Sequence, residues 1–225
     1  MIRISGMFCV IAAVAMFNAT PSIATVTSCS VNKPCVLNGP FPSGNDFDAD
    51  PNDETLRIWD EQQNYTLAED LAVDFVADAN ADFLIESGGT TFIQAGTIVS
   101  SHWVQWDNSG GNQNFSFVEG EIGFDSDIFA FITDDARLDA SDDVLGLPSV
   151  TYPDFEMRGL ELGSQDTVAF GSDLSTVEID WRAGSPGDWS RLLTAFSPTA
   201  ADTVPVPGLG LLVALGAMVL LRRPR

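Results

Sequence analysis

The sequence predicts an all-β fold, an antiparallel β-sandwich of jelly-roll-like character, and three observations lead to this prediction. Apolar and polar residues alternate in several short runs along the 225-residue chain, which is typical of strands with one buried face. Clusters of turn-forming residues separate the runs, for example at residues 87–89, 108–111 and 185–188. No long amphipathic helical pattern occurs between residues 56 and 196. Two sheets therefore have to pack face to face to bury their apolar sides.

The clearest strand lies at residues 176–182, with the sequence TVEIDWR. Val177, Ile179 and Trp181 are expected to face the core, and the charged residues between them to face water, because successive side chains of a strand point to opposite sides. The same alternation predicts further strands within residues 71–75, 97–106 and 117–124.

The first 24 residues have the three parts of a secretory signal peptide. Arg3 supplies a short positive region, residues 7–17 are apolar, and Pro21 precedes a small-x-small sequence that ends at Ala24. We expect cleavage after Ala24. The alternative is an uncleaved membrane anchor, but the apolar run is short for the ~20 residues that a membrane span needs.

These patterns divide the chain into five segments. We expect a signal peptide at residues 1–24, an irregular, turn-rich lead-in at 25–55, the β-sandwich domain at 56–196, a linker at 197–203 and a hydrophobic C-terminal sorting helix at 204–225. Length supports one sizeable domain, because 225 residues are too few for two large domains and two targeting segments.

The three cysteines point to one disulfide. Cys9 lies in the signal peptide, so Cys29 and Cys35 remain in the exported chain. A close pair in an oxidising compartment predicts a Cys29–Cys35 disulfide around a small loop. We expect no metal site there, since no other Cys or His residue lies nearby in the sequence.

The C-terminal segment has a three-part order. An apolar stretch at residues 208–221 follows a Val-Pro-Val-Pro sequence and precedes arginines that would stay in the cytoplasm. A plain single-span anchor is one interpretation. The order also resembles the sorting tails of the PEP-CTERM family, and most closely its Val-Pro-Leu-Pro-Ala variant, although Gly208 stands here where that variant has Ala. The residues that carry the resemblance are Val204, Pro205, Val206, Pro207, Arg222 and Arg223.

A second resemblance covers residues 58–194. The phrases GTIVSSHWVQWD, GEIGFDSDIFAFIT, LDASDDVLG, RGLELG and SPGDWSRLLT are similar to those of a globular domain that recurs in PEP-CTERM surface proteins. The two resemblances together imply an exported all-β domain whose tail is processed by an exosortase-type enzyme. They carry over no catalytic residue.

The charge of the chain excludes some partners. The sequence has 32 acidic and 10 basic residues, with a net charge of −22. Nucleic acid is excluded as a partner because phosphate binding needs clustered Lys and Arg. Such a surface could hold divalent cations, but we favour a solvated coat that keeps the protein soluble by self-repulsion.

Closely spaced aspartates give three candidate calcium sites. The best is formed by Asp46, Asp48 and Asp50, because Ca²⁺ takes six to eight oxygen ligands. The alternative is that these residues form turns, since Asp accepts local backbone hydrogen bonds. The second and third candidates are Asp125 with Asp127, and Asp139 with Asp142 and Asp143.

His102 is the only histidine. A catalytic triad would combine it with an aspartate such as Asp107 and a serine from another strand. No serine lies in a nucleophile-elbow sequence, so we favour a structural role for His102.

Two further residue groups have predicted roles. Arg158 is expected to form an ion pair with Asp142 or Asp143, and this pair would hold two loops together. Trp106 and Trp181 share faces with aliphatic residues and are assigned to the core. Trp189 follows a turn and is the tryptophan expected to be exposed, where it could stack on a sugar ring.

The sequence thus favours an exported, non-catalytic structural or adhesive protein of the cell surface or extracellular matrix. Before processing, its C-terminal helix would hold it transiently at the inner membrane. The alternative is a calcium-assisted carbohydrate-binding module for exported exopolysaccharide, and a hydrolase ranks third.

Overall fold

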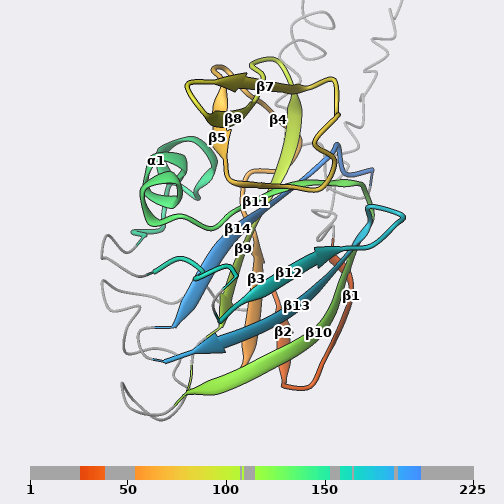
Figure 1. Ribbon diagram of the computed structural model, residues 1–225, viewed down its shortest axis with the longest axis vertical. Coiled ribbons are helices and arrows are strands. Elements are labelled where there is room, and N and C mark those ends of the chain that lie inside the picture. Colours follow the sequence, from red (N-terminus) through yellow and green to blue (C-terminus); the bar gives the residue numbers. More distant parts are fainter. Residues whose placement is uncertain are drawn as a thin grey trace, which may run out of the picture.

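The computed structural model describes residues 26–38, 54–106, 108, 115–152, 158–163, 165–184 and 187–198. In these ranges the protein is all-β, with a single short helix, α1 (Asp135–Leu145) (Figure 1). The all-β class expected from alternation is therefore confirmed. No helix within the described ranges has the length and apolar character needed to cross a bilayer.

The strands form three sheets. The four-stranded sheet has the order β1 (Val26–Val31), β10 (Ser116–Phe124), β13 (Thr176–Ala183) and β12 (Thr167–Phe170). The seven-stranded sheet has the order β2 (Cys35–Leu37), β3 (Leu56–Asp60), β9 (Ile98–Trp106), β14 (Asp188–Thr194), β11 (Ile128–Ile132) and β6 (Phe75–Val76), with β4 (Tyr65–Thr66) also paired to β9. The small sheet has the order β5 (Leu71–Val73), β8 (Thr90–Ile93) and β7 (Leu84–Ser87). Every pairing between these strands is antiparallel except that of β2 with β3.

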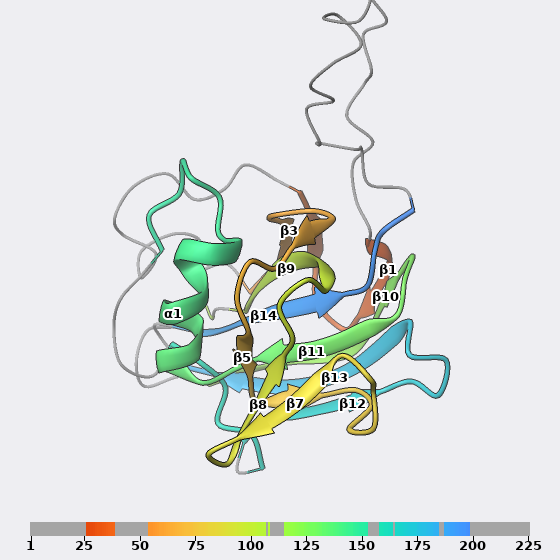
Figure 2. The ribbon, with the colours of Figure 1, turned by 90° about the horizontal axis from the view of Figure 1, so that it is seen from above.

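The seven-stranded sheet is covered on both faces. One face packs against the four-stranded sheet through a core that includes Trp106, Phe131 and Trp181. The other face packs against α1 and strands β5 and β8 through a second core that includes Trp103 and Trp189. Figure 1 shows α1 and the small sheet set apart from the four-stranded sheet, with β9 and β14 between them. Figure 2, seen from above, shows α1 on the opposite side of β14 from β1 and β10.

Alternation holds where a sheet has one covered face. In β13, Val177, Ile179 and Trp181 are buried and Glu178 and Asp180 are exposed, as the sequence predicts. The expectation of one wet face is wrong for the central strands. Every residue of β14 and all but the first residue of β9 are buried, because both faces of their sheet are covered.

The helix α1 was not foreseen, since its sequence lacks an amphipathic pattern. Only Leu138, Ser141 and Leu145 are buried, at spacings of three and four residues that form one narrow stripe. Asp134 caps the N-terminus, where its side chain accepts a hydrogen bond from the backbone N–H of Arg137 at 3.2 Å.

The interpretation of residues 25–55 as an irregular lead-in is wrong for its first part. β1 pairs with β10 and β2 pairs with β3, so these residues belong to the domain. The pattern was missed because both are edge strands with few buried side chains. A disulfide joins Cys29 in β1 to Cys35 in β2, with 6.5 Å between their Cα atoms. It therefore links the two large sheets covalently.

Replacing Cys29 and Cys35 by serine is expected to lower the free energy of unfolding by about 2 kcal/mol, because the unfolded chain regains the entropy that the closed loop removes. Urea unfolding of the full chain, followed by tryptophan fluorescence, measures the change. Reductant should bring the wild type to the midpoint of the double variant and leave the variant unchanged. Equal midpoints for the oxidised wild type and the variant would contradict the expected role of this link.

Candidate functional site

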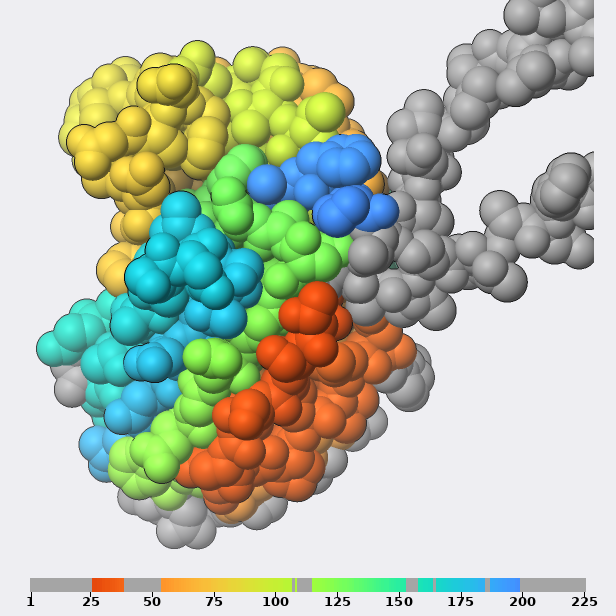
Figure 3. Space-filling model, turned by 90° about the vertical axis from the view of Figure 1, so that its right-hand side faces the viewer, coloured from red at the N-terminus to blue at the C-terminus, as the bar shows by residue number. Residues whose placement is uncertain are grey.

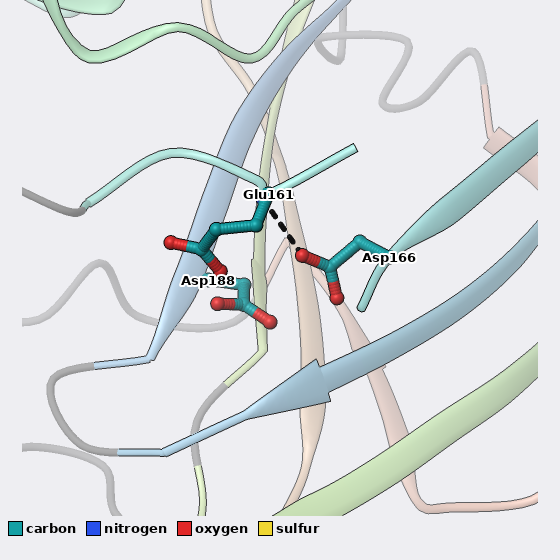
Figure 4. Close-up of side chains that lie close together, drawn as sticks. All are labelled: Glu161, Asp166 and Asp188. Carbon is teal, nitrogen blue, oxygen red and sulfur yellow. Dashed lines mark hydrogen bonds between the residues drawn. The ribbon is translucent and has the colours of Figure 1, made fainter. Parts of the chain in front are cut away.

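Three carboxylates converge at one end of the two large sheets. They belong to Glu161, Asp166 and Asp188, and an oxygen of each lies within 4.8 Å of an oxygen of the other two. Asp166 and Asp188 are buried, and Glu161 is half-buried. Figure 4 shows the side chains of Glu161 and Asp188 next to each other, with Asp166 approaching from the β12 side.

Backbone contacts position two of these three residues. Asp166 accepts hydrogen bonds from the backbone N–H groups of Glu161 and Arg182, each at 2.8 Å, which ties its loop to β13. Asp188 opens β14 and lies opposite Trp106 of β9 in the sheet register. The loop at residues 161–166 and the start of β14, which are distant in the sequence, thus bring three acidic side chains to one point.

The electrostatics of this cluster favour a bound proton or cation. Burial raises the pKa of Asp166 above its usual value, against the opposing effect of the two backbone N–H groups. Burial and the neighbouring Asp166 likewise raise the pKa of Glu161. Like charges this close repel each other unless a proton or a hard cation lies between them. Carboxylate oxygens are the ligands that Ca²⁺ prefers, so these three residues could hold such an ion.

The predicted calcium candidates lie in different parts of the chain, and the structure describes only some of them. Asp46, Asp48 and Asp50 lie outside the described residues. Asp125 accepts a hydrogen bond from Ser197 Oγ at 2.8 Å. Within the described ranges, Glu161, Asp166 and Asp188 form the only group of three such residues whose ligand atoms all lie within 4.8 Å of one another. Sequence spacing gave no sign of it, because Asp188 opens β14 and is far along the chain from the loop that holds Glu161 and Asp166.

The third candidate group lines a polar hollow beside α1. Asp139, Asp142 and Asp143 are among the residues around a cavity of about 510 Å³, together with Tyr152. Asp142 is not free for a cation there. Its carboxylate bonds Arg158 Nη2 and Arg191 Nη2, each at 3.0 Å. The structure thus brings Arg158 and Asp142 together as the expected ion pair, and adds a second arginine.

Arg191 is the centre of a buried polar network. Its guanidinium bonds both carboxylate oxygens of Glu61, through Nε at 2.6 Å and Nη2 at 2.8 Å. It also bonds the Ser141 hydroxyl of α1 and lies 5.0 Å from the ring centre of Trp103. Burial acts to lower the pKa of Arg191, but Glu61 outweighs it and holds the pKa above its usual value. Arg191 is therefore charged, and it fastens α1 to the central sheet.

Glu61 has all the partners that a buried carboxylate needs. Besides Arg191, it accepts hydrogen bonds from Ser101 Oγ at 2.6 Å and from Tyr152 Oη at 2.5 Å. Burial and the charge of Glu61 raise the pKa of Tyr152, so Tyr152 stays a donor. Tyr152 also accepts from the backbone N–H of Leu147 at 2.9 Å, which joins the segment after α1 to the network.

His102 occupies a buried position between β3 and β14. Its Nδ1 lies 2.8 Å from Asp60 Oδ1, and its Nε2 lies 3.4 Å from Thr194 Oγ1. The partner is thus Asp60, whereas Asp107 lies outside the described residues. In space, Asp60, His102 and Thr194 are arranged like a catalytic triad, with threonine in the place of the nucleophilic serine. Both His102 and Thr194 have no exposed surface, however, so a substrate cannot reach the hydroxyl in this conformation.

The prediction that Trp189 is exposed is wrong. Trp189 has no exposed surface. Its ring centre lies 6.3 Å from that of Trp103, and its backbone pairs with Gln105 of β9. The strand that follows the turn, β14, lies in the middle of the seven-stranded sheet and not at its edge. Trp106 and Trp181 are buried, as predicted.

The targeting residues are not part of the described structure. Ala24 and the six sorting-tail residues lie outside the described ranges. No family model, no curated protein and no solved structure matches the chain. The functional argument therefore depends on the residues themselves.

Replacing Glu61 by glutamine is expected to cost about 3–5 kcal/mol of the free energy of unfolding, because the charge of Arg191 would stay buried without its main partner. Urea unfolding of the full chain measures the loss. The exposed Glu69 gives the matched control, and Glu69→Gln should change stability by less than about 0.5 kcal/mol. A comparable, small effect of both variants would show that the network contributes little.

Proposed function

We propose that the chain is an exported, acidic protein of the cell surface or extracellular matrix, with a structural or adhesive role and no catalytic one. Its two large sheets form a β-sandwich of jelly-roll-like character. The signal peptide ends at Ala24. The tail that contains Val204, Pro207 and Arg222 directs processing by an exosortase-type enzyme after a transient stay at the inner membrane.

The disulfide between Cys29 and Cys35 is the observation that carries the proposal of export. Such bonds persist in oxidising compartments and are rare in the cytosol. This one joins the first two strands of the domain, directly after the expected cleavage site. The net charge of −22 is consistent with a solvated surface outside the cell.

A non-catalytic role is supported by how the reactive side chains are used. His102 and Arg191 are buried, and each is hydrogen-bonded to side chains of neighbouring strands or loops. Arg158 is buried against Asp142. In the described part of the chain these groups hold elements together, which is a sufficient reason for their presence.

Export and sorting are tested by the mass and location of the native protein in its own cells. We expect a species that starts at Thr25, ends between residues 204 and 208, and is found at the surface or in the medium. Intact-mass analysis of each cell fraction gives both results. A species that still carries Arg225 in the inner membrane would contradict sorting and indicate a plain anchor.

The cluster of Glu161, Asp166 and Asp188 favours a second candidate, a domain that needs calcium to bind carbohydrate. A cation between the three carboxylates would tie the loop at residues 161–166 to the start of β14, because Glu161 and Asp166 lie in that loop and Asp188 opens the strand. Such an ion would shape the end of the two large sheets, and the exopolysaccharide would then be the partner.

Calcium at millimolar concentration is expected to raise the melting temperature of the wild type by several degrees, because a ligand that binds only the folded state stabilises it. Differential scanning fluorimetry on the full chain in non-ionic detergent measures the shift. Glu161→Gln should melt higher than the wild type without calcium and gain little from it. Glu69→Gln, an exposed change outside all the candidate calcium groups, is the control and should keep the full shift. A wild type indifferent to calcium would eliminate this candidate.

A further inference from the structure

The outer face of the four-stranded sheet carries four exposed carboxylates in two rows. Glu119 of β10 lies directly opposite Asp180 of β13, and Glu121 lies directly opposite Glu178. Figure 3 shows β1, β10, β13 and β12 side by side. Side chains at directly opposed positions have Cβ atoms about 4.5–5.5 Å apart, so these like charges repel each other.

Nothing in the described part of the chain neutralises these carboxylates. None of the four forms a salt bridge among the described residues. The nearest cation along β13 is Arg182, which bonds Gln165 at 3.0 Å and stacks over Phe115 at 4.2 Å. The sheet therefore keeps a repulsive arrangement that a cationic ligand would relieve.

The same face is hollow and continues into an aromatic surface. The four carboxylates line a hollow of about 500 Å³ that reaches Ser30 of β1 and Ala169 of β12. This volume is in the range of ligand-binding sites. Phe117 lies two residues before Glu119 on β10, on the same side, and is 52% exposed; Phe115 beside it is 49% exposed. An anionic hollow with an exposed apolar end fits a ligand that is both cationic and partly apolar.

We propose that this face binds an extended basic peptide segment of a partner protein. A second copy of this chain does not fit, because its net charge is also −22. The two carboxylate rows are two residues apart along the strands, which is about 6.7 Å. An extended peptide with Lys or Arg at every second residue presents cations at the same repeat. An apolar residue at its end would contact Phe117.

The proposal is tested with a labelled peptide of alternating lysine and serine that ends in leucine. Fluorescence anisotropy with the full chain in non-ionic detergent measures the dissociation constant, at low and at physiological salt. A peptide of the same composition with its lysines in one block tests the spacing. We expect the alternating peptide to bind several-fold more tightly, and its affinity to fall as salt rises.

Two double variants separate this face from general charge attraction. Glu119→Gln with Glu178→Gln removes one carboxylate from each opposed pair, and should weaken binding about five- to twentyfold while raising the melting temperature. Glu69→Gln with Asp139→Asn removes the same charge elsewhere and should leave binding nearly unchanged. The higher melting temperature rules out misfolding as the reason for lost affinity.

Three outcomes would overturn the proposal. The first is no binding of the alternating peptide at low salt. The second is equal weakening by the two double variants, which would show that net charge alone attracts the peptide. The third is binding of a soluble amino-sugar oligomer in this hollow without binding of the peptide. The test does not depend on export, because it uses the purified chain.

Discussion

The ion pair between Arg191 and Glu61 is the interaction on which the arrangement around the central sheet depends. A charged pair inside a protein loses its hydration, and it is stable only when each charge has close partners. Here Glu61 accepts from Arg191, Ser101 and Tyr152. Arg191 in turn reaches Ser141 and Asp142 of α1. One guanidinium thus connects β14, the end of β3 and the helix.

This network holds α1 over the second face of the seven-stranded sheet. A sheet with apolar residues on both faces needs a cover on each side, and the four-stranded sheet provides only one. The helix α1 provides much of the second, although it buries just three of its own side chains. Such a weakly amphipathic helix gains little from apolar burial, so its polar contacts to Arg191 and the pair of Asp142 with Arg158 position it. The disulfide holds the opposite edge, where β1 and β2 contribute few buried residues.

Acidic residues have three different kinds of surroundings in this fold. Glu61 and Asp142 are paired with arginines in the interior. Glu161, Asp166 and Asp188 meet at the end of the two large sheets, where burial and repulsion raise the pKa of the first two. Glu119 and Glu178 and their neighbours stand in water on a sheet face. The few basic residues account for the first group, and the other two groups are where we propose that cations from outside bind.

The sequence by itself determined the strands with one wet face, since alternation in β13 follows directly from the pleat of the backbone. It also determined the closeness of Cys29 to Cys35 and placed Arg158 in an ion pair. The tertiary structure alone decided the rest. Arg191 and Trp189 occur in a strand whose two faces are both covered, and a local pattern does not reveal the second cover. The group of Glu161, Asp166 and Asp188 exists because one loop packs against the start of β14, and the opposed pairs exist because β10 and β13 pair in one register. Their spacing along the chain carries no trace of that meeting, because the distances are set by packing between elements and not by the backbone that connects them.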